Sequence, residues 1–260
     1  METVSEPTPS DVLDDMAALV RRLQPIRELR MRSVLMASYL TSVSEERAVR
    51  TLALLLQRGK SGQDVGCALA LDSLVAVLGD AELMPYATRA SLYATAKELG
   101  QLVIARWFFD ASPNQRGDAV RRENGLVPEW RPTPGGRALT LGERKSLARG
   151  HRREVLRTVL LDPHAEVIRI LLGNPTLTES DVLQIASRRP CDSETLAVVA
   201  HDTRFGTRYA VRRALVKNPY TPVHLSIRLL ASMRRTDLST IAQDQQLAEV
   251  VREQARALLD

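Results

Sequence analysis

Residues 160–186 have the sequence LLDPHAEVIRILLGNPTLTESDVLQIA, and residues 198–231 have the related sequence VVAHDTRFGTRYAVRRALVKNPYTPVHLSIRLLA. A third, shorter copy, STIAQDQQLAEVVREQARALL, spans residues 239–259. All three copies share an aspartate at steps of 40 and 42 residues, namely Asp162, Asp202 and Asp244. The first two also share an Asn-Pro pair at a step of 44 residues, Asn174-Pro175 and Asn218-Pro219. A period near 40 residues built from paired helical segments is typical of an α-solenoid.

The shared residues suit helix ends and turns. Each aspartate ends an apolar segment, so we expect it to cap the helix that follows. Asn174 and Asn218 each follow a helix and precede a proline, which prevents the helix from continuing; we expect both asparagines to adopt the left-handed backbone conformation. Thr178 and Thr221 then fall where the second helix of each pair begins, and we expect each threonine to cap that helix.

The order of residues in the copies resembles the leucine-rich-repeat variant family. It places an aspartate before Val167-Ile168-Arg169 or Val250-Val251-Arg252, and Asn-Pro-x-x-Thr follows at 174–178. The resemblance covers roughly residues 141–260 and implies an α-solenoid, for which a HEAT-like stack is an equally fair description. Some members of that family carry an iron–sulfur segment with clustered cysteines, which this chain, with two cysteines, does not match. The same half also resembles a group of uncharacterised bacterial proteins, which implies no activity.

The N-terminal part is also patterned as helix. Ser10 before Asp11 is a candidate N-cap, and apolar residues follow at helical spacing, namely Val12, Met16, Leu19 and Leu23. Further helices are expected at about 26–39, 44–59, 63–78, 84–99 and 101–109. No alternating run rich in β-branched residues indicates a strand. The fold class is therefore predicted as all-α: a HEAT-like or leucine-rich-repeat-variant-like α-solenoid with an N-terminal helical domain.

Composition changes between the two helical parts. The stretch from Ala111 to Leu139 holds four prolines and four glycines, which disfavour regular structure. We therefore expect an N-terminal helical domain at 1–110, a Pro/Gly-rich linker at 111–140 and a repeat domain at 141–260.

Composition and length narrow the class of protein. The 260 residues are 44% hydrophobic and 26% charged, which is typical of a globular chain. No apolar window is long enough for a membrane span, and the acidic start, METVSEPTPSDVLDD, does not resemble a secretory signal. Two distant cysteines predict neither a disulfide framework nor a structural metal centre. We expect a cytoplasmic protein without a metal or other cofactor.

The positive charge is unevenly distributed. Residues 1–140 hold 17 basic and 17 acidic residues, whereas residues 141–260 hold 19 and 14, so the net charge of +5 falls in the C-terminal half. On the helix expected at about 206–217, Val211 and Leu215 should face the core. The opposite arc holds Arg208, Tyr209, Arg212, Arg213 and Lys217.

This arc is the first candidate binding surface. Four cations around one tyrosine would attract nucleic acid, another polyanion or an acidic protein surface. A second basic group on the preceding repeat, including Arg153 and Arg157, could extend it. The alternative is structural: arginine stems cover apolar surface between helices and pair with acids such as Asp192, Glu194 and Asp202.

Motifs for catalysis are lacking. His201 and Asp202 are adjacent, but sequence adjacency does not bring two side chains face to face, so a helix-end role is the simpler interpretation. The chain has no phosphate-binding glycine loop and no Gly-x-Ser-x-Gly. We therefore expect a non-catalytic protein.

The sequence thus predicts a cytoplasmic scaffold or adaptor that binds another protein along stacked helices. Nucleic-acid binding through the basic arc is the first alternative. A HEAT-like DNA-base glycosylase is a remote one, because such chemistry needs aromatic residues and the chain is only 4% aromatic.

Overall fold

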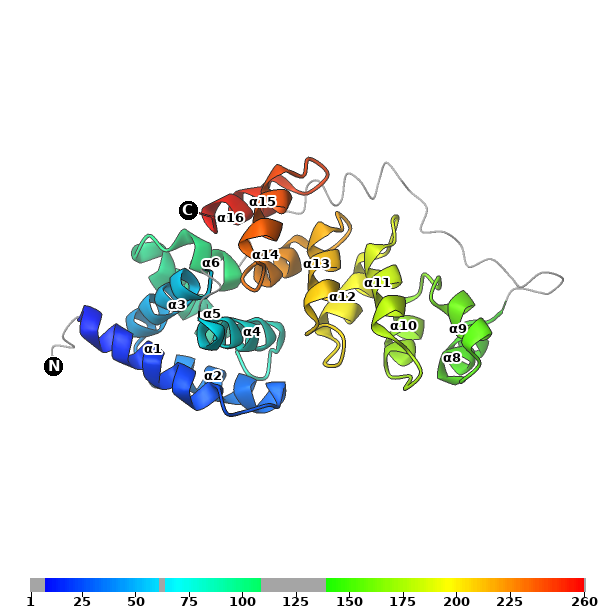
Figure 1. The fold of residues 1–260 in the computed structure, drawn as a ribbon, viewed down its shortest axis with the longest axis horizontal. Helices are drawn as coiled ribbons and strands as arrows, with labels where there is room; N and C mark the ends of the chain where they lie inside the picture. The colour runs from blue at the N-terminus through cyan, green and yellow to red at the C-terminus, as the bar shows by residue number, and fades with distance from the viewer. Residues whose placement is uncertain (1–7, 61–63, 109–138, 260) are drawn as a thin grey trace. The chain divides into compact units, whose positions relative to one another are not determined.

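The computed structural model describes residues 8–60, 64–108 and 139–259. Within these ranges every regular element is an α-helix, fifteen in all, and none is a strand (Figure 1). The all-α prediction is therefore confirmed. The Pro/Gly-rich linker expected at 111–140 lies, apart from its last two residues, outside the described residues.

The chain divides into two compact units. Unit 1 comprises Met1–Ala111, Ile227–Thr240 and Gln254–Asp260; unit 2 comprises Ser112–Ser226 and Ile241–Glu253. The units therefore do not follow the linear order expected from the sequence, because two C-terminal segments group with the N-terminal helices. Hydrogen bonds show why: within unit 1, the side chains of Arg228 and Gln254 donate to the carbonyl oxygens of Trp107 (3.3 Å) and Val103 (2.9 Å).

Unit 1 begins with six helices. They are α1 (Pro9–Leu23), α2 (Leu29–Ser42), α3 (Glu45–Lys60), α4 (Val65–Gly79), α5 (Tyr86–Glu98) and α6 (Leu102–Phe108). These bounds confirm the helices expected from the sequence to within about three residues at each end. The N-cap of α1 is Thr8 rather than Ser10, because Thr8 and Asp11 form a reciprocal capping box.

The core of unit 1 forms where α3 packs against α1, α4 and α5 and where α2 packs against α4. The four apolar residues expected to face inward on α1 are all buried. Trp107 and Phe108 are fully buried, as a core role requires. Polar residues join the packing: the Tyr39 hydroxyl donates to the Thr51 hydroxyl at 2.8 Å.

The first helices of unit 2 follow one another in chain order (Figure 1). They are α8 (Leu141–Arg149), α9 (Arg153–Val159), α10 (Ala165–Leu172), α11 (Glu179–Ser187), α12 (Ser193–His201) and α13 (Tyr209–Lys217). The packing alternates: α10 lies against both α8 and α12, and α11 lies against α13. The last helices are α14 (Val223–Leu230), α15 (Arg235–Gln243) and α16 (Glu249–Ala257), and a boundary between the units falls within each.

The two repeated asparagines join every second helix. Asn174, at the end of α10, donates its side-chain amide to the carbonyl oxygens of Ala148 (2.9 Å) and Gly150 (2.7 Å) at the end of α8. Asn218, at the end of α13, donates in the same way to Ala186 (2.8 Å) and Arg188 (3.0 Å) at the end of α11. We call this arrangement the asparagine clamp.

The left-handed conformation expected for these asparagines is wrong. Asn218 has φ −89° and ψ 116°, and no described residue other than glycine has a positive φ. The physical reason is the next residue, because proline pushes its predecessor into the extended region. The asparagines are used for their side-chain amides, which the repeat pattern alone did not reveal.

The three repeated aspartates share a different role from the one expected. The carboxylate of each accepts the backbone N–H two residues on, from His164 (2.9 Å), Arg204 (3.0 Å) and Gln246 (3.0 Å) respectively. Asp162 and Asp202 therefore close turns, while the N-caps of α10 and α13 are His164 and Arg208.

The two threonines differ from each other. Thr178 caps α11 as expected, in a capping box with Asp181. The expectation for Thr221 is wrong, because its hydroxyl donates to the carbonyl oxygen of Leu215 at 2.6 Å and so stabilises the end of α13.

The asparagine clamp generates a stability prediction. Asn218→Ala should lower the free energy of unfolding by about 2–3 kcal/mol, because buried carbonyl groups lose their donors. Asn218→Asp should be similarly destabilised, since aspartate keeps the acceptor for the Tyr220 N–H (3.1 Å) but offers no amide hydrogens. Urea denaturation followed by circular dichroism measures the change.

The control is Gln184→Ala, which removes an exposed amide from α11. It should change the free energy of unfolding by less than about 0.5 kcal/mol. An Asn218→Ala protein as stable as this control would contradict the clamp.

Candidate functional site

The basic arc expected on α13 is only partly a surface. Val211 and Leu215 are buried, as expected, but Arg212 is also buried, at 4% exposed. Its Nε donates to the carbonyl oxygen of Gly206 at 3.0 Å. The assignment of Arg212 to an exposed binding surface is therefore wrong, because its guanidinium finds a backbone acceptor below the helix start and its stem covers core.

Arg208 is exposed, but it is engaged by a neighbouring helix. Its Nη1 forms an ion pair with Glu179 at 2.8 Å, at the start of α11. The guanidinium also lies over the ring of the buried Phe205, 5.8 Å from the centroid. Arg208 thus ties α13 to α11, which agrees with the structural alternative considered for this arc.

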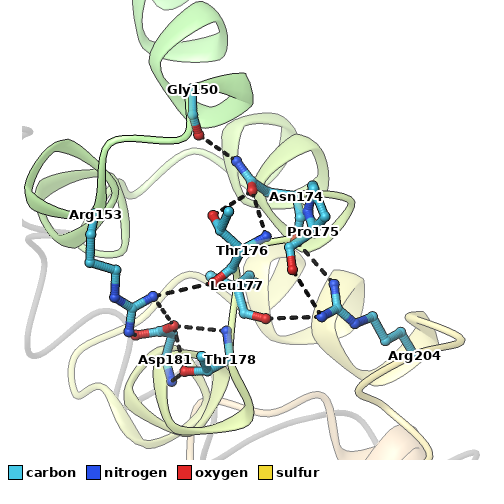
Figure 2. A network of polar contacts seen from close by, with 9 residues as sticks. All are labelled: Gly150, Arg153, Asn174, Pro175, Thr176, Leu177, Thr178, Asp181 and Arg204. Carbon is cyan, nitrogen blue, oxygen red and sulfur yellow. Dashed lines mark hydrogen bonds and ion pairs between the residues drawn. The ribbon is translucent and has the colours of Figure 1, made fainter.

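Arg153, the first residue of α9, takes part in the polar network shown in Figure 2. Its two Nη atoms donate to the Asp181 carboxylate at 2.6 and 2.7 Å, a bidentate pair. The same carboxylate accepts the backbone N–H and the hydroxyl of Thr178 at 2.8 and 2.6 Å. One buried carboxylate therefore joins the start of α9 to the start of α11.

Burial of Asp181 opposes ionisation of its carboxyl group. The hydrogen bonds from Arg153 and Thr178 outweigh that effect and hold the pKa of Asp181 below its ordinary value. The carboxylate is thus fixed in its charged form.

Arg204 supplies a third link in Figure 2, from the loop before α13. Its Nη atoms donate to the carbonyl oxygens of Asn174 (3.0 Å), Pro175 (3.4 Å) and Leu177 (3.0 Å). These carbonyls belong to the turn that follows α10. One guanidinium therefore satisfies three carbonyls of the Asn-Pro turn, a partnership that no local sequence pattern indicates.

The remaining candidate residues lie on two separate helices. Tyr209 and Lys217 are half-buried and Arg213 is exposed, all on α13, whereas Arg157 is exposed on α9. The two basic groups meet at the start of α11, where Arg153 pairs with Asp181 and Arg208 pairs with Glu179.

A groove lies between α10 and α12, with a volume of about 420 Å³. Its lining residues are Arg169, Leu172, Glu194, Ala197, Val198, His201, Asp202 and Thr203. The apolar members are buried or half-buried and form the lining's interior, whereas Arg169, Glu194 and His201 are exposed. We call this feature the α10–α12 groove.

The groove combines a narrow apolar strip with charges of both signs. This combination suits an apolar side chain flanked by polar groups. Sequence periodicity does not reveal the groove, because Leu172 and Val198 come together only through the packing of α10 on α12. The signal that was available is Ala197-Val198, an apolar pair on α12 that does not reach the core.

The groove offers little for catalysis through His201 and Asp202. The Asp202 carboxylate accepts the backbone N–H groups of Arg204 (3.0 Å) and Phe205 (2.7 Å), so it is committed to the turn after α12. Among the described residues, no group of three metal-ligating side chains is close enough to hold an ion.

The Arg153–Asp181 pair predicts a pH-dependent stability. Arg153→Met should lower the free energy of unfolding at pH 7 by about 1–2 kcal/mol, a modest value because the Arg153 side chain is 43% exposed. A carboxyl group whose pKa is lowered on folding stabilises the protein above its unfolded pKa, near 4, and loses that effect as the pH falls through the folded pKa. The difference between parent and variant should therefore shrink below about pH 4, as urea denaturation across pH would show.

Arg157→Met is the matched control, four residues further along α9. No ion pair joins Arg157 to the described residues, so its loss should cost less than about 0.5 kcal/mol at either pH. Equal effects of the two substitutions would contradict the role assigned to Arg153.

No family model, no curated protein and no solved structure matches the chain. Across the described ranges, every helix is too short or too polar to cross a membrane.

Proposed function

We propose that unit 2 is a helical-repeat α-solenoid and that the protein is a non-catalytic scaffold, whose α10–α12 groove binds a segment of another protein. The solenoid part of the proposal is supported by the alternating packing of helices and by the asparagine clamp, in which Asn174 and, 44 residues on, Asn218 each donate to two backbone carbonyls at the end of another helix. Stacked repeats of this kind present long surfaces for binding.

The observation that carries the binding proposal is the chemistry of the groove. Its interior is apolar (Leu172, Ala197 and Val198), and its exposed charges, Arg169 and Glu194, have opposite signs. A polyanion would meet the carboxylates of Glu194 and Asp202 in the same lining as Arg169, whereas a peptide can bury an apolar side chain and pair with charges of both signs.

The contacts made by the candidate arginines favour a protein rather than a nucleic acid as the binding partner. Arg153 and Arg208 are neutralised by Asp181 and Glu179, and Arg212 is buried. Nucleic-acid binding depends on cations that are free to replace counterions along phosphates. These three arginines are therefore engaged within the fold, although the net charge of the C-terminal half is unchanged by such pairing.

The test is selection of a random-peptide phage library on the purified full-length protein. Peptides with an apolar anchor should be enriched, and Val198→Glu should weaken them by about 10-fold or more, since a carboxylate replaces part of the apolar lining. Leu161→Glu is the matched control, because Leu161 is 63% exposed in the same unit and does not line the groove. Melting temperatures confirm that both variants fold.

Fluorescence anisotropy with random-sequence DNA at about 50 and 200 mM salt tests the alternative that the protein binds nucleic acid. We expect no binding at either concentration. Peptides that bind Val198→Glu as tightly as the parent would refute the groove, and salt-sensitive DNA binding that is lost in Arg157→Glu would favour the nucleic-acid alternative.

A further inference from the structure

The helices α8, α10 and α12 form a row in which neighbouring helices run in the same direction. The Thr195 hydroxyl, near the start of α12, donates to the carbonyl oxygen of Pro163, just before α10, at 3.2 Å. At the other end, Arg204, in the loop after α12, donates to the carbonyl oxygen of Asn174, after α10, at 3.0 Å. The helices α8 and α10 are parallel too, because they pack along each other and the Asn174 amide joins their ends.

Two charged positions recur along this row. The fifth residue is a cation in both α8 and α10, namely Lys145 and Arg169. The second residue is a glutamate in both α10 and α12, namely Glu166 and Glu194. The row therefore offers the same cation–glutamate pair twice, once between α8 and α10 and once between α10 and α12.

Only the first of these two pairs is formed among the residues that the structure describes. Lys145 Nζ and the Glu166 carboxylate form an ion pair, and the hydrogen bond from Lys145 holds the pKa of Glu166 below its ordinary value. The side chains of Arg169 and Glu194 are exposed and make no hydrogen bond or ion pair with any described residue. Both of them line the α10–α12 groove. The groove thus opens at the position where the equivalent charges of α8 and α10 meet.

Two other carboxylates of this region are already engaged. Glu166, which precedes Arg169 by three residues on α10, pairs with Lys145. The Asp202 carboxylate, in the groove lining, accepts two backbone N–H groups of the turn after α12. The charges of Arg169 and Glu194 are therefore available to a ligand.

These two charges lie beside the apolar strip of the groove. A helix rises about 1.5 Å per residue, so Ala197 and Val198 lie about one turn beyond Glu194, and Leu172 lies about one turn beyond Arg169, on the same helix faces. All five residues line the groove. A ligand that places an apolar side chain on the strip therefore has a cation and an anion of the protein within about one turn of its anchor.

We infer that the segment bound in the α10–α12 groove carries a basic residue, an acidic residue and an apolar anchor, and that Glu194 and Arg169 select it by pairing with its two charges. The inference rests on the function proposed for the groove and adds its specificity. An exposed ion pair contributes little to affinity, but charges of both signs discriminate between partners, because a segment with two like charges meets repulsion at one of them.

Peptides enriched from the random-peptide phage library on the parent protein provide the probe. We expect the enriched sequences to contain residues of both signs beside the apolar anchor. Fluorescence anisotropy then measures binding of a synthetic, labelled copy of one such peptide. Arg169→Glu and Glu194→Arg should each weaken this binding by about 10-fold, since attraction becomes repulsion. Their melting temperatures should stay close to that of the parent, because both side chains are exposed.

Reversal of charge in the peptide separates pairing from a structural effect. A peptide whose acidic residue is replaced by lysine should bind the parent weakly, but should bind Arg169→Glu about as tightly as the original peptide binds the parent. A peptide whose basic residue is replaced by glutamate should restore binding to Glu194→Arg in the same way.

Arg157→Glu and Glu154→Arg are the matched controls. Both residues are exposed on α9 and lie outside the groove lining, and Glu154 is the second residue of its helix, as Glu194 is. Each control should bind the original peptide as the parent does.

The outcomes distinguish the inference from the function on which it rests. If the enriched peptides lack charged residues, or if both groove variants bind like the parent, while Val198→Glu still weakens binding, the groove stands and its assigned specificity is overturned. Weakening of the same size in the two controls would also overturn it, because any change of charge would then suffice. If no peptide is enriched, or if Val198→Glu binds as tightly as the parent, the proposed groove fails and the inference fails with it.

Discussion

The side-chain amide of a buried asparagine determines how the helices of unit 2 are spaced. Helices of seven to nine residues leave a large share of their carbonyl groups without an intrahelical partner. At the ends of α8 and α11 these carbonyls are met by the amides of Asn174 and Asn218. An amide has two hydrogens at a fixed angle, so it links two carbonyls of one helix end only if the helices lie at one separation. The apolar contacts of α8 with α10 and of α11 with α13 follow from that separation.

Arginine side chains also donate hydrogen bonds to carbonyl groups that have no partner within a helix. Arg204 donates to three carbonyl oxygens of the Asn-Pro turn, and Arg188 donates to the carbonyl oxygens of Leu160 and Asp162 at 3.4 and 3.2 Å. A guanidinium has five donors and no acceptor, which suits loops rich in orphan carbonyls. Short helices therefore leave carbonyl groups that need side-chain donors from elsewhere in the chain, and arginine supplies these donors. The need for such donors accounts for several arginine residues of the C-terminal half without any external anion.

Hydrophobic periodicity predicted the helices and most of the core, because a helix with one buried face has an apolar residue at that face in every turn. It also predicted Val211 as a core residue and Thr178 as a cap, since both roles depend on neighbours close in the chain. It failed where the partner lies outside the residue's own helix. Arg212 is buried because its guanidinium donates to the Gly206 carbonyl, in the loop before α13. Asn174 has its role because its amide reaches the end of α8. The α10–α12 groove forms between two helices whose contact no local sequence pattern predicts.

The contrast between the arginines of the two units follows from the same accounting of donors and acceptors. In unit 2, Arg153 and Arg208 have carboxylates and Arg204 has three carbonyls, so their charges or donors are matched within the chain. In unit 1, Arg228 has a single carbonyl and a like-charged neighbour, Arg89. Burial of such a group costs free energy that one hydrogen bond to Trp107 offsets only in part, so packing of the apolar stem of Arg228 must offset the rest.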